Sequence, residues 1–118
     1  MECSTRFYKG CQIIELHKSL VAKSSKEIQQ IFNLILENQS SDIIIDLSNV
    51  ENIDYAGIGA ITFLYKRLKE RKREMGLLGV NQNIEEWLNT LHINNTIKSY
   101  TNINDFISDT HHALGYYH

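Results

Sequence analysis

The chain has 118 residues, of which 42% are hydrophobic and 22% are charged, and its formal net charge is −2. This length predicts a single domain, residues 1–118, with enough hydrophobic residues to bury a core without disulfides or structural metal. The slightly acidic balance argues against a protein that binds nucleic acid through an overall basic surface, so no nucleic-acid partner is expected.

The cysteine content and hydropathy indicate where the protein works. Two cysteines are too few for a disulfide framework, which favours a reducing, cytoplasmic location. No apolar run is long enough to cross a bilayer and no secretory signal segment is recognisable, so membrane insertion is not expected. The cysteines and histidines lack metal-ligand spacing, and we expect no metal and no cofactor. No nucleophile stands in a recognisable elbow with a histidine and an acid, so an enzyme is not expected.

The N-terminal third predicts two strands and one helix. Residues 1–9 form a candidate edge strand and residues 11–16 a stronger one, with Gly10 in the turn between them. Ser24 and Glu27 have the spacing of a capping box at the start of the helix. An apolar stripe marks the inner side of this helix, at Ile28, Ile31, Phe32 and Ile35, and two leucines widen it, Leu34 and Leu36.

The stretch 42–73 is the most strongly patterned part of the chain. It opens with three consecutive isoleucines at 43–45, and such a run without alternation is typical of a strand that is covered on both faces. Residues 48–53 are expected to turn. An amphipathic helix is expected to follow at 60–72.

The residues between this strand and this helix are the main candidates for function. Asp54 can cap the helix, because its carboxylate can accept hydrogen bonds from free N–H groups of the first turn. Gly57 and Gly59 have no Cβ, so another group can approach the backbone closely there. In open α/β sheets, binding sites lie where strands end and helices begin.

The helix predicted at 60–72 has two distinct sides. An apolar side should face the sheet, made of Ile58, Ile61, Leu64, Tyr65 and Leu68. Gly59, Phe63, Lys66 and Glu70 fall on the opposite side. An exposed phenylalanine beside a glycine suggests contact with a partner, although single exposed aromatics are common on protein surfaces. The basic run 66–73 is interpreted as a solvated helix end.

The C-terminal third predicts two further strands and two helices. Residues 74–80 should form a strand, and an asparagine of the polar turn 81–83 should cap the next helix. The apolar face of that helix is made of Ile84, Trp87, Leu88 and Leu91. Residues 96–100 should form a last strand at an edge. The terminal helix should begin at Asn102 or Asn104 and bury Ile103, Phe106 and Ile107, and residues 116–118 are expected to be a frayed tail.

Three phosphate- or metal-binding interpretations of this region fail on the residues present. The glycines at 57 and 59 lack the third glycine of a dinucleotide fingerprint, and the Gly-Lys-Ser/Thr end of a P-loop is missing. A receiver-type magnesium site also needs an acidic pair after the first strand, which Asp46 and Asp54 lack, and Lys98 is the only late lysine near a strand. Asp46 is expected instead to accept hydrogen bonds from nearby N–H groups.

Residues 46–50 read Asp-Leu-Ser-Asn-Val and residues 54–59 read Asp-Tyr-Ala-Gly-Ile-Gly. This pair of segments resembles the signature of the STAS domains of anti-sigma factor antagonists, Asp-Leu-Ser-x-Val followed by Asp-Ser-Ser/Thr-Gly-x-Gly. The resemblance extends over about 11–106, with 42–73 as its motif core. It implies an α/β fold with a mixed central sheet of about four to five strands, covered by about four helices. Where the family has a Gly-x-Leu-Asp turn, at 18–21, only Leu20 matches.

The resemblance also implies a partner, an anti-sigma factor of the histidine-kinase-like ATPase type, and hence a role in transcription regulation. The residues it implies for contact are Asp54, Tyr55, Ala56, Gly57, Ile58, Gly59, Phe63 and Lys66. The hydroxyl residue that the partner kinase phosphorylates in the family is Ala56 here, and the serine before it is Tyr55. Alanine cannot accept phosphate, so no switch is expected at this site. Ser48 and Tyr55 offer hydroxyls nearby, but neither matches the family position.

Two points stay open at this stage. The first is whether the domain acts in a sigma-factor pathway or as a scaffold or accessory subunit of a transporter or multi-protein complex, because STAS domains serve in both. The second is its oligomeric state, for which a homodimer is one option.

Overall fold

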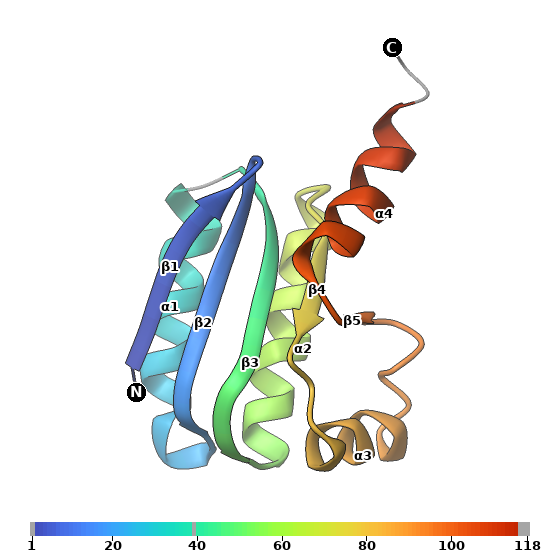
Figure 1. Cartoon of the computed structure of the whole chain (residues 1–118). Helices are drawn as coiled ribbons and strands as arrows, with labels where there is room; N and C mark the ends of the chain where they lie inside the picture. The colour runs from blue at the N-terminus through green and yellow to red at the C-terminus, as the bar shows by residue number, and fades with distance from the viewer. Residues whose placement is uncertain (1, 39, 116–118) are drawn as a thin grey trace.

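The computed structural model of the chain describes residues 2–38 and 40–115, so the tail expected at 116–118 lies outside the described residues. These residues form a five-stranded sheet in the order β1-β2-β3-β4-β5 (Figure 1). β1 is antiparallel to β2, and the other neighbours are parallel. The strands are β1 (Glu2–Tyr8), β2 (Cys11–Leu20), β3 (Asp42–Ile53), β4 (Met75–Leu78) and β5 (Ser99–Tyr100).

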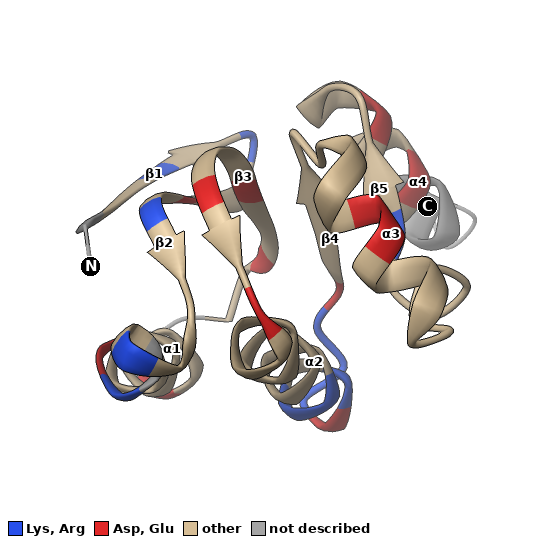
Figure 2. Ribbon diagram, turned by 90° about the horizontal axis from the view of Figure 1, so that it is seen from below, with Lys and Arg blue, Asp and Glu red and all other residues tan. Residues whose placement is uncertain are grey.

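The described region also contains four α-helices and one short 3-10 turn, and the last of these helices follows β5. The helices are α1 (Ser25–Asn38), α2 (Tyr55–Glu70), α3 (Gln82–Thr90) and α4 (Ile103–Gly115), and the turn is Ala22–Ser24. α1 and α2 lie side by side on one face of the sheet, whereas α4 lies on the opposite face near β4 and β5 (Figure 2). α3 lies at the end of the sheet where α2 begins (Figure 1). The predicted mixed α/β sheet with about four helices is therefore confirmed.

The sheet has a hydrophobic cluster on each face. The larger one joins the sheet to α1, α2 and α3 and includes Leu16, Phe32, Ile45, Leu64 and Leu88. The smaller one lies under α4 and consists of Cys11, Ile13, Ile44, Phe106 and Ile107. α4 approaches β4 closely because Gly76 has no side chain: a Cβ there would lie 2.8 Å from both the Phe106 and the Tyr100 rings.

β3 confirms the strand predicted from the isoleucine run and extends beyond it. Residues 43–47 are all buried, as expected for a strand with cover on both faces. The segment 48–53, expected to turn, continues as strand because it pairs in parallel with the end of β2, up to Leu20 and Ile53. Two register irregularities, between Glu15 and His17 and between Lys18 and Ser19, each leave one extra residue on β3 and make this pairing fit. Sequence patterns do not reveal the strand at 48–53, because the segment is mostly polar and only Val50 and Ile53 point into the core.

Other boundaries differ in ways that tertiary contacts explain. Leu34, expected to widen the apolar stripe of α1, is 60% exposed. The hydroxyl of Ser24 donates back to the carbonyl of Ser19 or Val21, in a 3-10 turn that precedes α1. The predicted capping asparagine of α3 is Asn81, whose Oδ1 accepts from the Ile84 N–H at 2.9 Å. β4 and β5 are shorter than the strands expected at 74–80 and 96–100. Among the described residues, no helix combines the length and hydropathy needed to span a bilayer.

Candidate docking surface at the start of helix α2

The motif segment 54–59 forms the cap and first residues of α2, whereas a loop followed by a helix from residue 60 was expected. α2 begins at Tyr55, directly after Asp54, whose extended backbone (φ −129°, ψ −172°) is that of an N-cap. Asp54 Oδ1 accepts a hydrogen bond from the Gly57 N–H at 3.1 Å. The predicted capping role is confirmed, and the two glycines lie within the helix.

The second oxygen of the same carboxylate reaches a different part of the chain. Asp54 Oδ2 accepts a hydrogen bond from the Ala22 N–H at 3.0 Å, in the turn that follows β2. These backbone donors, with Ala22 first and Gly57 next, hold the pKa of Asp54 below its ordinary value because they stabilise the ionised form. A charged carboxylate here also suits the positive end of the α2 dipole. Asp54 therefore fixes the end of β2 against the start of α2.

The two glycines of the motif have different surroundings. Gly57 is buried, and a Cβ on it would collide with the backbone carbonyl of Leu20. The group that approaches Gly57 is thus the chain itself, so this residue serves packing. Gly59 is exposed, and a Cβ there would meet no atom within 4 Å. Of the two, only Gly59 offers bare backbone to a partner.

Tyr55 and Ala56, the two positions that depart from the family pattern, lie in the first turn of α2. The Tyr55 side chain is 67% exposed. Its ring packs edge-on against Trp87 of α3, with 5.9 Å between ring centroids and an interplanar angle of 90°. Ala56 is half-buried beside it. The Tyr55 ring is therefore held in place by a second ring and is still largely exposed.

The outward side of α2 confirms the predicted division into two faces. Phe63 is 48% exposed, Lys66 is exposed, and Arg67 lies over the Phe63 ring at 5.8 Å from its centroid. Ile58 is 1% exposed, so the expectation that it contacts a partner directly is not supported; it forms part of the core and only the floor of the surface.

A hollow of about 370 Å³ runs between α2 and the end of α3. Its lining is mostly apolar: Tyr55, Ile58, Gly59, Thr62, Phe63, Lys66, Leu91 and Ile93. We call this set the α2–α3 surface. Thr62, Leu91 and Ile93 are additions that sequence reasoning did not assign to a site. The signal for them was weak, because Leu91 and Ile93 look like ordinary core positions at the end of an amphipathic helix.

Three of the six cations in the basic run 66–73 are paired with carboxylates or buried within the domain. Lys69 Nζ lies 2.8 Å from Glu74 Oε2, and Arg67 Nη1 lies 3.8 Å from Glu70 Oε2. Arg73 is buried, and its Nε donates to the Ser41 carbonyl at 2.7 Å. Figure 2 shows these blue segments along α2 and its connection to β4, next to red ones. Charge pairing within the domain supports the interpretation as a solvated helix end.

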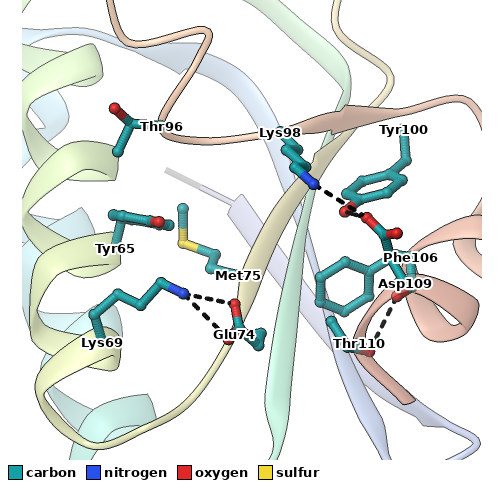
Figure 3. A pocket seen from close by; sticks show the side chains of 10 residues that line it. All are labelled: Tyr65, Lys69, Glu74, Met75, Thr96, Lys98, Tyr100, Phe106, Asp109 and Thr110. Carbon is teal, nitrogen blue, oxygen red and sulfur yellow. Dashed lines mark hydrogen bonds and ion pairs between the residues drawn. The ribbon is translucent and has the colours of Figure 1, made fainter. Parts of the chain in front are cut away.

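A second hollow, of about 260 Å³, lies at the β4–β5 edge between α2 and α4 (Figure 3). On one side Lys69 pairs with Glu74. On the other, Asp109 Oδ2 accepts from the Tyr100 hydroxyl at 2.7 Å and lies 3.6 Å from Lys98 Nζ. Burial and the neighbouring carboxylate raise the pKa of Tyr100. The charges here pair with one another and fix α4 to β5, so we interpret this hollow as structural.

Asp46 is separate from the docking surface. It is 7% exposed, and its Oδ1 accepts from the Ser48 N–H at 2.9 Å and from the Ser48 hydroxyl at 2.5 Å. The expectation that Asp46 accepts nearby N–H bonds is confirmed. In the described part of the chain, no group of three or more histidine, cysteine, aspartate or glutamate side chains is arranged to hold a metal ion.

The order of strands, the capped start of α2 and the two signature segments agree with one sequence family. The family model of the STAS domain matches residues 2–106. The chain belongs to the STAS domain family. The Asp-Leu-Ser-Asn-Val segment of this STAS domain lies in β3, and the Asp-Tyr-Ala-Gly-Ile-Gly segment forms the cap and start of α2.

Solved structures share the fold of this STAS domain at low sequence identity. A protein of Thermotoga maritima described as an anti-sigma factor antagonist has a TM-score of 0.82 at 20% identity, over 91% of this chain and 92% of that one. An anti-sigma factor antagonist from Mycobacterium paratuberculosis gives 0.81 at 15% identity, over 92% of each chain. A sulfate transporter family protein from Wolinella succinogenes gives 0.68 at 18% identity, over 82% of this chain and 81% of that one. At these identities the likeness is evidence of a common fold.

Proposed function

We propose that this STAS domain is a cytoplasmic protein-binding module that regulates transcription by binding an anti-sigma factor of the histidine-kinase-like ATPase type. The observation that carries the proposal is the α2–α3 surface, an apolar hollow with an exposed tyrosine, beside the Asp54-capped start of α2. It is the position at which members of the family with this signature are expected to meet their partner. The fold shared with anti-sigma factor antagonists supports the same assignment.

The chemistry of this surface suits a protein partner. Tyr55 and Phe63 are large aromatic side chains that are exposed at 67% and 48%, and aromatic residues often dominate the energy of protein interfaces. Tyr55 already packs against Trp87, so little side-chain freedom is lost when a partner covers it. Lys66 lines the hollow as a cation. We therefore propose a partner that inserts an apolar side chain between Tyr55 and Phe63 and places an acidic one near Lys66.

Ala56 determines how such binding would be regulated. A phosphoryl group adds about −1.5 to −2 charge and three acceptor oxygens. On a surface that a partner must desolvate, that charge would break the complex, which is the switch the family resemblance implies. Ala56 carries no hydroxyl. The proposed complex is therefore constitutive with respect to this position, with Asp54, Tyr55, Gly59, Phe63 and Lys66 as its contact residues and Ala56 next to Tyr55 in the first turn of α2.

Isothermal titration calorimetry with a histidine-kinase-like ATPase from the same cell tests binding. The unaltered chain should bind, and Tyr55→Ala and Phe63→Ala should each weaken binding by about tenfold or more, as expected for aromatic contact residues. Leu34→Ala is the matched control, because Leu34 is 60% exposed but lies on α1. Absence of binding by the unaltered chain, or equal weakening by Leu34→Ala, would contradict the proposal.

A phosphorylation assay tests the regulatory part separately. With ATP and the same ATPase, the unaltered chain should incorporate no phosphate and keep its partner. Ala56→Ser should become a phosphate acceptor and release the partner on modification. Phosphorylation of the unaltered chain at Ser48 or Tyr55 with release of the partner would show that the complex is switched after all.

The shared fold with a sulfate transporter family protein favours one alternative, an accessory or scaffold STAS subunit. In that case the ATPase would not bind. Tyr55→Ala and Phe63→Ala would instead reduce co-purification of the chain with a transporter or a multi-protein complex. The two functions are thus distinguished by which assembly responds to the same two variants.

A further inference from the structure

β1 is the outermost strand of the sheet, and within the described residues it pairs only with β2 (Figure 1). Its seven residues run in unbroken register with β2 from Glu2 to Tyr8. Natural edge strands usually avoid pairing with other chains by means of charged side chains, a proline, a bulge, a very short length or a covering element, and β1 carries the charge of Arg6. The chain has no proline, and the register irregularities lie between β2 and β3.

The hairpin between β1 and β2 determines which backbone groups of β1 point outward. Tyr8 and Cys11 flank a two-residue turn in which Lys9 and Gly10 have φ of 52° and 80°, as in a type I′ turn. The Tyr8 carbonyl therefore faces the Cys11 N–H and points toward β2. Backbone direction alternates along a strand, so the N–H and C=O groups of Cys3, Thr5 and Phe7 point away from β2.

The same three residues share the α1 side of the sheet. Cys3 packs against the larger core cluster together with Ile31 of α1, and side chains alternate along β1. Thr5 and Phe7 therefore lie on this side as well, and both are exposed, Phe7 at 56%. No charged side chain of β1 stands between them. At the outer edge of β1, the backbone N–H and C=O groups of Cys3, Thr5 and Phe7 therefore point away from β2. The side chains of these three residues carry no charge.

We propose that β1 is a homodimer interface in which a second copy of the chain adds its own β1 antiparallel, about a two-fold axis at Thr5. In this register Thr5 faces Thr5 of the second copy, and Cys3 faces Phe7. Each of these residues both donates and accepts one hydrogen bond, because all three present their backbone groups outward. Phe7 of each copy covers the half-buried Cys3 of the other.

Charge supports a second copy as the occupant. On the opposite side of the sheet, the two-fold axis places the cation Arg6 against the neutral Ser4 of the other chain. Like charges directly opposite one another would destabilise an antiparallel pair, and none meet between residues 3 and 8 in this register. The strand is therefore self-complementary in backbone direction, side-chain size and charge.

Light scattering coupled to size-exclusion chromatography over a concentration series tests the proposal. The unaltered chain should approach twice the 13.7 kDa of one chain as concentration rises. Thr5→Pro should return it to one chain, because proline removes an outward N–H while the hairpin with β2 is kept. A circular dichroism melt of Thr5→Pro that matches the unaltered chain shows that folding is intact. A monomer at every concentration would overturn the proposal, as would a dimer that persists in a folded Thr5→Pro chain.

Disulfide trapping tests the register without relying on that variant. In a Cys3→Ser background, Thr5→Cys places its thiols on the two-fold axis, where an antiparallel hydrogen-bonded pair has Cα atoms about 5.5 Å apart, within disulfide reach. Mild oxidation should give a covalent dimer. Ser4→Cys in the same background is the matched control and should give little, because its thiols are offset along the strands. Equal crosslinking of the two variants, or none by Thr5→Cys, would overturn the proposed register.

Discussion

The backbone carbonyl of Leu20, at the end of β2, occupies the space in which a side chain on Gly57 would have to lie. The same carbonyl accepts a hydrogen bond from the Asp54 N–H at 3.3 Å. Leu20 itself is fully buried. The end of β2 and the first turn of α2 are therefore in direct backbone contact, and the orientation of the proposed docking surface depends on it.

Gly57→Ala and Gly59→Ala should have opposite effects on stability. The methyl group at 57 would collide with a backbone atom that cannot rotate away, and such overpacking costs about 1–3 kcal/mol. At 59 the space is open, and alanine in place of glycine within a helix gains up to about 1 kcal/mol. Urea unfolding of the two variants beside the unaltered chain measures both. Equal effects would mean that the contact with Leu20 does not constrain α2.

Phe63→Ala should weaken partner binding and leave folding nearly unchanged. Its side chain is 48% exposed, so little core surface is lost on truncation. Leu64→Ala is the contrasting variant, since Leu64 is fully buried and its loss should cost about 2–5 kcal/mol. Thermal melts and titrations on both variants separate the two effects. Equal loss of stability and binding in Phe63→Ala would show that Phe63 acts only through the fold.

The contribution of Asp54 to stability should disappear in acid. Because the pKa of Asp54 is lower in the folded chain than the ordinary 3.8, the carboxylate stabilises the fold above that pH. This stabilisation is lost as the pH falls through the folded pKa. Urea unfolding should therefore show a gap between the unaltered chain and Asp54→Asn at neutral pH that closes on acidification.

Asn81→Ala provides the control for this pH dependence. Asn81 caps α3 with a neutral amide, and its loss should cost about 1 kcal/mol at neutral and acidic pH alike. A gap for Asp54→Asn that stays constant with pH would show that the charge on Asp54 contributes nothing.

Tyr100 should limit stability at alkaline pH. The pKa of Tyr100 is raised above the ordinary 10.0 by burial and by Asp109, so the folded chain holds the phenolic proton more tightly than the unfolded chain. The stabilisation is full below about pH 10 and is lost as the pH rises above it. Tyr100→Phe should lower stability at neutral pH and flatten the alkaline decline. An unchanged decline in Tyr100→Phe would assign it to other groups.

The sequence alone identified those features of the site that depend on residues close together in the chain. The isoleucine run at 43–45 predicted a doubly covered strand, and the carboxylate of Asp54 predicted a helix cap, because both depend on side-chain type and short-range spacing. The role of Gly57 could not be predicted in this way. Its contact, Leu20, lies far away in sequence and belongs to a strand whose end was not recognised.

The same limit explains the remaining differences. The Tyr55 ring packs against Trp87 because α3 lies at the same end of the sheet as the start of α2 (Figure 1). Leu34 follows the apolar period of α1 but lies at the edge of the stripe, where no element covers it enough to bury it. Periodicity gives the direction of a side chain on its own helix, whereas burial depends on which other elements reach that side.

The Asp54 carboxylate accepts hydrogen bonds from the amides of Ala22 and Gly57, which lie on segments that lead into different helices. A ligand that displaces the N-terminus of α2 would consequently also displace the turn that precedes α1. In hydrogen–deuterium exchange, these two amides should open together and slow down together once the surface is occupied. Occupation of the docking surface would thus stabilise the starts of two neighbouring helices on the same face of the sheet without any change of fold.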